Sequence, residues 1–170
     1  MTKQLTLRIL AWTIDFGIIF LYAILLFVIS NQFFNDKQEE YNPYLGQLRG
    51  FLCLTLPIIL YSYFTEGSNL KATIGKKVVK LIVIAQDNET KKSILTRNLL
   101  KYLPWEIAHT GVHWLMYFDS TSNEIPIWTW FLLIVPQVLV VIYFVSILLS
   151  KGQTSIYDRI LGIKLQLRNT

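Results

Sequence analysis

The sequence predicts an all-α integral membrane protein with four transmembrane helices. They form two parallel helix-pair repeats, each followed by a short cytoplasmic segment that is either amphipathic or a hairpin. The first supporting observation is composition: of 170 residues, 53% are hydrophobic and 16% are charged, whereas a soluble domain carries about a quarter charged residues. The second is that apolar residues are concentrated in four blocks, and the third is that the two halves of the chain resemble each other.

Each apolar block is a candidate helix. Crossing ~30 Å of hydrocarbon takes about 20 helical residues. The first and last blocks both reach this length; the first contains one charged residue, Asp15, and the last contains none. The second block contains Arg49, and the third is the shortest. The predicted helices cover residues 9–30, 45–64, 102–118 and 125–149. The cytoplasmic segments are then 65–101 and 150–170, so the whole chain, 1–170, is a single membrane domain.

Basic residues set the predicted orientation. Of 16 Lys and Arg residues, all but Lys37 and Arg49 lie before the first predicted helix, between the second and third, or after the fourth. The positive-inside rule therefore places both termini in the cytoplasm, and we expect the plasma membrane of a prokaryote. Contact with anionic lipid headgroups explains the net charge of +5, so no nucleic-acid partner is needed.

Two alignments indicate an internal duplication. "TIGKKVVKLIVI" (73–84) aligns with "SIYDRILGIKLQ" (155–166), and "LRILAWTI" (7–14) aligns with "LKYLPWEI" (100–107) at a slightly larger offset. A longer outer loop in the first half than in the second accounts for the difference between the two offsets. Both units start on the same side of the membrane, so an axis along the membrane normal would relate them.

The secondary structure of the cytoplasmic segments stays open. Residues 76–95 fit a short hairpin or an amphipathic stretch at the interface. Residues 155–167 fit one side of a helix before a strand-like end.

Three motifs together resemble the RDD family of small membrane proteins, which is named for one arginine and two aspartates. They are Arg8 and Asp15 in the first helix, "TIGKKVVKLIVI" after the second, and Asp158 within "GQTSIYDRILGIKL". The resemblance extends from about residue 8 to residue 167, and it implies that Arg8, Asp15 and Asp158 are the signature residues. It departs from the family where Ile163, in place of threonine, follows Gly162. For the family, movement of a ligand or cation is the usual suggestion.

The signature residues can also be considered physically. Arg8 and Asp15 lie within roughly 20° of the same helix face but about 10.5 Å apart along the axis, so we expect no direct pair. Arg8 can extend to the headgroups. Asp15 lies inside the span, where a charge costs on the order of 2.5–3.5 kcal/mol, and should face the bundle interior. Asp158 and Arg159 can bond locally, cap a helix or contact the middle segment.

The third helix carries Glu106, His109 and His113 on one face, within an arc of roughly 60°. In one interpretation they line a polar seam with Asp15 that relays protons or binds a cation; in another the histidines only join helices. A metal site is the weakest alternative, because a second E-x-x-H and the zinc motif H-E-x-x-H are both absent. We expect no metal and no cofactor.

These observations predict that the protein moves a small solute or a monovalent cation, with coupling to protons, as a homo-oligomer. Neither a glycine-rich phosphate loop nor a nucleophile elbow is present, so we expect no enzyme. The alternative is a non-catalytic membrane scaffold that docks a cytoplasmic partner.

Overall fold

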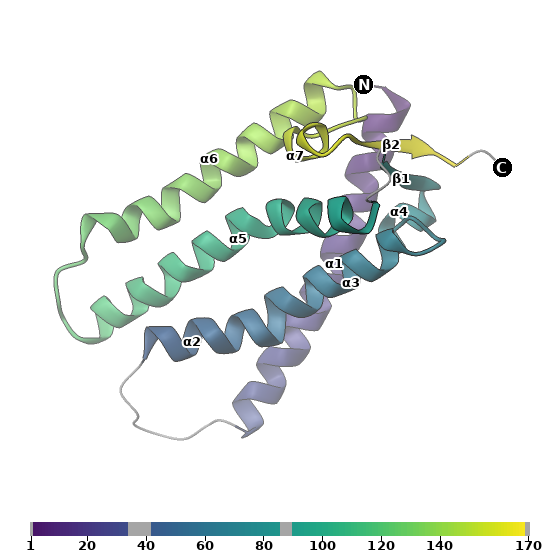
Figure 1. Cartoon of the computed structure of the whole chain (residues 1–170). Coiled ribbons are helices and arrows are strands. Elements are labelled where there is room, and N and C mark those ends of the chain that lie inside the picture. The colour runs from purple at the N-terminus through teal and green to yellow at the C-terminus, as the bar shows by residue number, and fades with distance from the viewer. Residues whose placement is uncertain (1, 34–41, 86–89, 169–170) are drawn as a thin grey trace.

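A computed structural model describes residues 2–33, 42–85 and 90–168. Long helices diverge from one end of the molecule, where two short helices and two strands gather and where both termini lie (Figure 1). We call this the sheet end, and the opposite end the far end. The long elements are α1 (Lys3–Phe33), α2 (Pro43–Gly50), the π-helical η1 (Phe51–Thr55), α3 (Leu56–Gly67), α5 (Thr90–Ser120) and α6 (Ile127–Leu149). The short elements are α4 (Ile74–Val78), β1 (Leu81–Ala85), α7 (Ile156–Ile160) and β2 (Ile163–Leu167).

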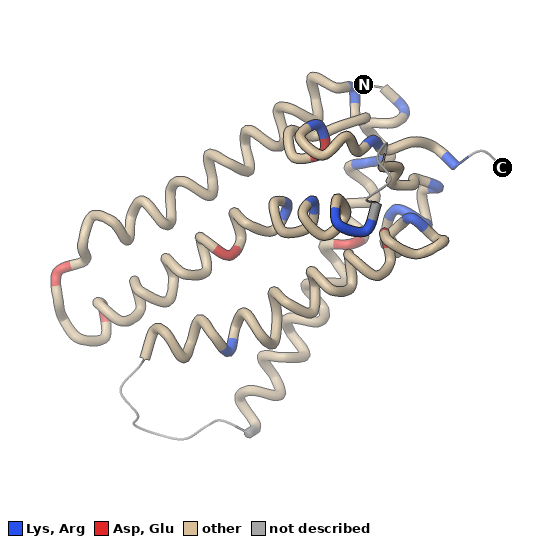
Figure 2. Tube along the Cα trace, in the orientation of Figure 1, with Lys and Arg blue, Asp and Glu red and all other residues tan. Residues whose placement is uncertain are grey.

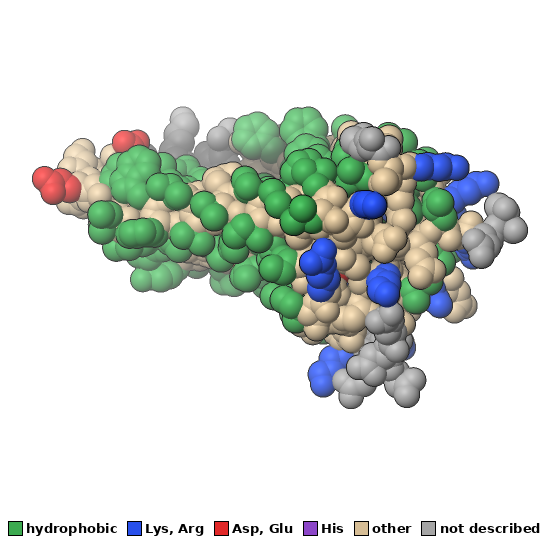
Figure 3. All heavy atoms as spheres, turned by 90° about the horizontal axis from the view of Figure 1, so that it is seen from above, with side chains coloured by type: hydrophobic (Ala, Val, Ile, Leu, Met, Phe, Trp, Pro, Cys, Tyr) green, Lys and Arg blue, Asp and Glu red, His purple; other side chains and the backbone are tan. Residues whose placement is uncertain are grey.

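Three helices are long and apolar enough to cross a membrane. They cover residues 3–32, 43–67 and 127–149, the second being the continuous run of α2, η1 and α3. Only 6% of the most apolar window of α1 and of α6 is buried within the chain, and hydrophobic side chains are spread along the body of the molecule on the face shown in Figure 3. These surfaces suit a lipid environment, in which apolar side chains need no protein partner. The third predicted helix, 102–118, falls in the second part of α5, which lies beside α6.

Prolines inside the helices release backbone carbonyls, and neighbouring tyrosines bind two of them. Pro57 cannot donate to the carbonyl of Cys53, four residues earlier, and the hydroxyl of Tyr22 in α1 donates to that oxygen at 2.6 Å. Pro104 likewise frees the carbonyl of Leu100, which accepts from the Tyr143 hydroxyl of α6 at 3.0 Å. Each tyrosine thus joins two helices at a point where proline removes a backbone hydrogen bond. In lipid, such a freed carbonyl requires a partner from a neighbouring helix.

The strands at the sheet end come from the two segments that follow helix pairs. β1 and β2 are antiparallel, with Leu81 opposite Leu167 and Ala85 opposite Ile163. The hairpin alternative for residues 76–95 is therefore wrong, because the partner of β1 lies near the C-terminus and residues 93–95 belong to α5. The other alternative, an amphipathic stretch at the interface, does not include a strand. In the structure Leu81 and Val83 belong to β1, and their side chains are buried. Residues 155–167 contain both a short helix and a strand.

The two segments correspond residue by residue. The offset in the chain between α4 and α7 equals the offset between β1 and β2, and it is the offset at which the two sequences align. The amide of Val83 donates to the carbonyl of Lys71 at 2.8 Å, and the equivalent amide of Leu165 donates to that of Gln153 at 3.0 Å. Between helix and strand, Lys80 has φ +58° and its counterpart Gly162 has φ +60°. The first of the two sequence alignments thus relates matching local structures.

Candidate functional site

A network of buried charges joins the helices at the sheet end. Three acidic and three basic side chains take part, and each residue is at most 8% exposed. They come from five different elements or connections, so the network holds distant parts of the chain together (Figure 2). The members are Arg8, Asp15, Glu66, Lys76, Arg97 and Asp158.

Asp158 is the acceptor between two arginines. Its Oδ2 accepts from Nη2 of Arg8 at 2.7 Å, and its Oδ1 accepts from Nε of Arg97 at 2.6 Å. The same carboxylate accepts from the Ser155 amide at 2.8 Å and completes a capping box at the start of α7. Arg8 also donates to the Gly152 carbonyl at 3.1 Å. Arg8 is therefore buried within the protein, and the expectation that it extends to the headgroups is wrong.

Glu66 continues the network from α3. Its Oε2 accepts from Nη1 of Arg97 at 2.6 Å, and its Oε1 accepts from the Lys76 ammonium at 2.8 Å. The side-chain amide of Asn98 adds a bond of 3.2 Å to Oε2. Arg97 is thus shared between two carboxylates, which is the geometry that its fork of donors suits.

Asp15 forms the edge of the network on α1. Its Oδ2 accepts from the Thr73 hydroxyl at 2.6 Å, its Oδ1 accepts from the Gly75 amide at 2.8 Å, and Lys76 lies 4.0 Å away. A Cβ on Gly75 would lie 2.2 Å from the Ala11 carbonyl oxygen, so only glycine lets α4 approach α1 this closely. As predicted, Asp15 faces the interior, and it makes no direct pair with Arg8.

Burial and neighbouring charges have opposite effects on the pKa values of Asp158 and Lys76. Burial alone would raise the pKa of the Asp158 carboxyl, but the nearby Arg97 and Arg8 offset this and lower it to about 2. Burial lowers the pKa of the Lys76 ammonium to about 8, although the Glu66 carboxylate acts in the opposite direction. At neutral pH Asp158 is therefore ionised, and most Lys76 side chains are protonated. Removing one partner of such a buried pair costs about 3–5 kcal/mol, because a charge is left uncompensated.

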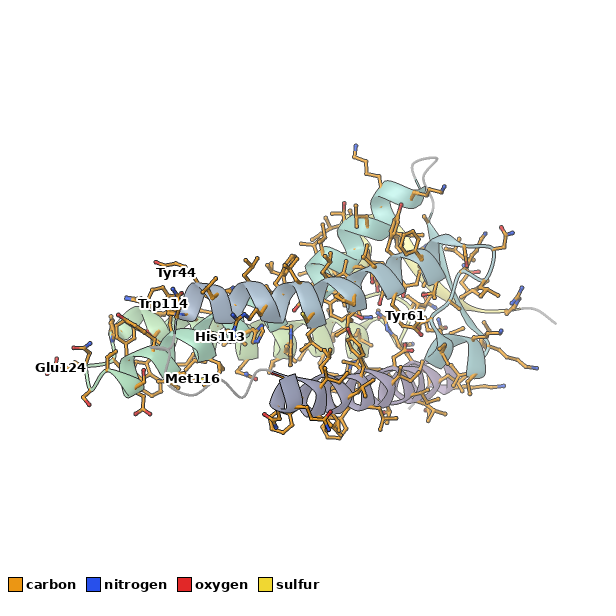
Figure 4. The ribbon with its side chains drawn as sticks, turned by 90° about the horizontal axis from the view of Figure 1, so that it is seen from below. Tyr44, Tyr61, His113, Trp114, Met116 and Glu124 are labelled. Carbon is orange, nitrogen blue, oxygen red and sulfur yellow. The ribbon has the colours of Figure 1, made fainter. Side chains whose placement is uncertain are left out.

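A second polar cluster lies deeper along α5, against α2 and η1. Oε2 of Glu106 accepts from the Thr55 hydroxyl at 2.7 Å, and the Thr110 hydroxyl accepts from the Gln47 side chain. The Nε2 atoms of His109 and His113 are 3.1 Å apart. The side chain of His113 points from α5 in the half of the molecule nearer the far end, whereas Tyr61 lies near the sheet end (Figure 4).

A cavity of about 180 Å³ lies between these clusters, along α1. Most of its lining is apolar; its polar members are Asp15, Thr55, Lys101 and Tyr102. Thr55 belongs to the cavity wall and also donates to Glu106. Asp15 and the partner of Glu106 thus line one partly open space beside α1.

The structure divides the residues predicted for the site into two groups. The signature residues Arg8, Asp15 and Asp158 share the sheet-end network, while Glu106, His109 and His113 share the deeper cluster. Asp15 and Glu106 make no described contact, and the cavity and Thr55 lie between them. Arg159, also considered, is exposed and bonds Thr154 at 3.1 Å.

Sequence reasoning missed three charged members of the network: Glu66, Lys76 and Arg97. Glu66 directly follows the apolar block of the second helix, and the two basic residues were counted only as topology signals. Arg97 is 31 positions from Glu66 and 61 from Asp158, so no helical or strand spacing connects them. Glu66, an acid at the end of an apolar helix, was the available signal.

Comparison with known proteins identifies a family but no individual relative. The model described as the RDD family matches residues 2–162, nearly the whole chain. No curated protein and no solved structure matches the chain.

Proposed function

This chain belongs to the RDD family, and we propose that it moves a small solute or monovalent cation across the membrane in exchange for protons. The observation that carries the proposal is the cavity along α1, because Asp15 and the Thr55 partner of Glu106 both line this partly open space between membrane helices. Ionisable groups at such a depth usually mark ion pathways or proton relays. We assign the protein no catalysed reaction.

Two carboxylates are the proton carriers in this proposal. Asp15 lies at the sheet end of the path, where α4 covers it through Thr73 and Gly75. Glu106 lies beyond the cavity, bonded to a hydroxyl rather than to a cation. Protonation of either group releases a bound cation, and its deprotonation restores a negative site, which is the minimum that exchange requires.

The sheet-end network closes the path on that side. α4 rests on α1 with no room for a Cβ at Gly75, and the charges behind it are paired within the protein. Opening of the path at the sheet end therefore requires α4 and β1 to move away from Asp15. The same movement exposes Asp15 to solvent on the sheet side.

We also propose the finer arrangement in the membrane. α5 is the fourth span, the sheet end faces the cytoplasm of a prokaryotic cell, and the two halves are parallel repeats. The matching helix–strand segments support the repeats, and the basic residues gathered at the sheet end support the orientation (Figure 2). We further propose a homo-oligomer, because a bundle of four helices is thin for an aqueous pathway.

The test is cation-driven proton flux in proteoliposomes that contain the purified protein and an internal pH dye. Pulses of Na⁺, K⁺ or Li⁺ should change internal pH, and Glu106→Gln should reduce the rate at least about tenfold, the size of a general acid–base contribution at its low end. Asp15→Asn should do the same. Glu124→Gln is the matched control, since Glu124 is exposed in the connection before α6.

Two results would remove the transport proposal. One is the absence of flux with every cation from protein that is folded and inserted; the other is unchanged flux in Glu106→Gln. The scaffold is then the better candidate, because exposed basic residues surround the sheet, among them Lys77, Lys80 and Lys164. Crosslinking from these positions in cells, with capture of one acidic protein, would support it.

A further inference from the structure

The two histidines of the chain form a pair on α5, and we propose that they bind a divalent transition-metal ion such as Zn²⁺, Ni²⁺ or Cu²⁺. His109 and His113 are one helical turn apart, and their ring centroids are separated by 4.5 Å. Their Nε2 atoms share a hydrogen bond of 3.1 Å, so a bound ion takes the place of the shared proton, which moves to the other nitrogen of its ring. This site lies beyond the proposed monovalent exchange and does not depend on it.

The nitrogen separation fits two ligands of one ion. With metal–nitrogen bonds of about 2.05 Å, two nitrogens 3.1 Å apart subtend an angle of about 98° at the ion. This value lies between the ideal octahedral angle of about 90° and the tetrahedral angle of about 109°, both of which these metals adopt. The ion would occupy the apex of a triangle whose base joins the two Nε2 atoms.

The neighbouring helix fixes the position of the His109 ring. A Cβ on Gly50 would lie 2.1 Å from Cε1 and 2.9 Å from Nε2 of that ring, so the imidazole occupies the space that a side chain would fill. Gly50 directly precedes the π-helical turn η1, and such turns are often found at functional sites. The close approach holds one ligand in place before any ion arrives.

The residues around the histidine pair favour reversible binding of a metal cation. Glu106 lies on the same face one turn before His109 and supplies negative charge nearby. Both histidines are half-buried. Within the described part of the chain, no group of three or more His, Cys, Asp or Glu residues forms a metal site, so the pair supplies two protein ligands and leaves the remaining coordination positions open.

The experiment measures metal binding to the purified chain carrying no histidine tag, in lipid nanodiscs. Because the sequence contains two histidines, any imidazole signal must come from this pair. Titration with ZnCl₂ should give one ion per chain, and electron paramagnetic resonance with CuCl₂ should show coupling to imidazole nitrogen. His109→Gln and His113→Gln should each weaken binding at least about tenfold, since even outer-shell partners change affinity by roughly 10–100-fold.

Gly50→Ala provides a variant that keeps both histidines but displaces the His109 ring, and it should weaken binding to a similar degree. Gly17→Ala is its matched control, because a Cβ there meets nothing within 4 Å. Folded wild-type protein without imidazole coupling, or undiminished Zn²⁺ binding in the double histidine variant, overturns the inference. Binding at equilibrium requires no flux, so failure of exchange and failure of this site are distinguishable.

Discussion

Arg97 is the most connected member of the sheet-end network, and Arg97→Met tests whether the network holds the fold together. The substitution keeps much of the side-chain volume but removes the donors to Glu66 and Asp158, each at 2.6 Å. Both carboxylates are fully buried, so neither can be solvated in place of its lost partner. We expect a loss of about 3–5 kcal/mol in the free energy of unfolding.

The expected loss is large enough to measure by thermal unfolding. For a chain of this size, 1 kcal/mol shifts Tm by roughly 2–4 °C, so Arg97→Met should lower Tm by roughly 6–20 °C. Tryptophan fluorescence of detergent-solubilised protein follows the transition. The matched control is Arg159→Met, an exposed arginine that bonds Thr154 and whose replacement should cost less than about 0.5 kcal/mol.

A further variant separates charge from packing. When Glu66→Gln is combined with Arg97→Met, Asp158 keeps Arg8 and Asp15 keeps Lys76, so the remaining buried charges balance and much of the lost stability should return. If Arg97→Met melts within about 2 °C of Arg159→Met, the network contributes little to stability, and the reasoning from buried charges is refuted.

Three other perturbations have expected outcomes. Because the pKa of Asp158 is lowered to about 2 from an ordinary 3.8, its contribution of about 2 kcal/mol is present above pH 4 and is lost as pH falls toward 2; Asp158→Asn should flatten stability in that range. Tyr22→Phe should cost about 1 kcal/mol through the carbonyl of Cys53, and less in a Pro57→Ala background, where the ladder bond can form; equal costs in both backgrounds would contradict this explanation. Gly75→Ala should destabilise by about 1–3 kcal/mol, because its Cβ meets the Ala11 carbonyl; a melting temperature equal to that of Gly17→Ala would show that α4 can shift without cost.

Much of the fold followed from local patterns in the sequence. Apolar blocks predicted the long helices, three of which qualify as spans by length and composition, and the family resemblance is confirmed by the match to residues 2–162. The duplication stays a prediction, although one offset relates both the two short helices and the two strands.

What local patterns missed depends on partners far apart in the chain. One of the two alternatives for residues 76–95, a hairpin, gave β1 a partner within its own segment because hairpin signals are local, whereas its partner β2 follows α5, α6 and α7 in the chain. For Arg8 the sequence offered contact with the headgroups, which needs no protein partner, yet Asp158, 150 positions away, binds it. A single sequence contains no signal for contacts of this range.

The distance between Arg8 and Asp158 has a consequence for biogenesis. Asp158, β2 and the capping box of α7 all lie at or beyond Ser155, so the ribosome delivers them after every long helix has been made. Until then Arg8 and Arg97 lack one carboxylate each and β1 lacks its strand partner. A nascent chain that has inserted its helices is thus still incomplete until residues 155–167 have been made and have joined Arg8, Arg97 and β1. A chain shortened before Ser155 should therefore insert its long helices, lack these contacts and be degraded.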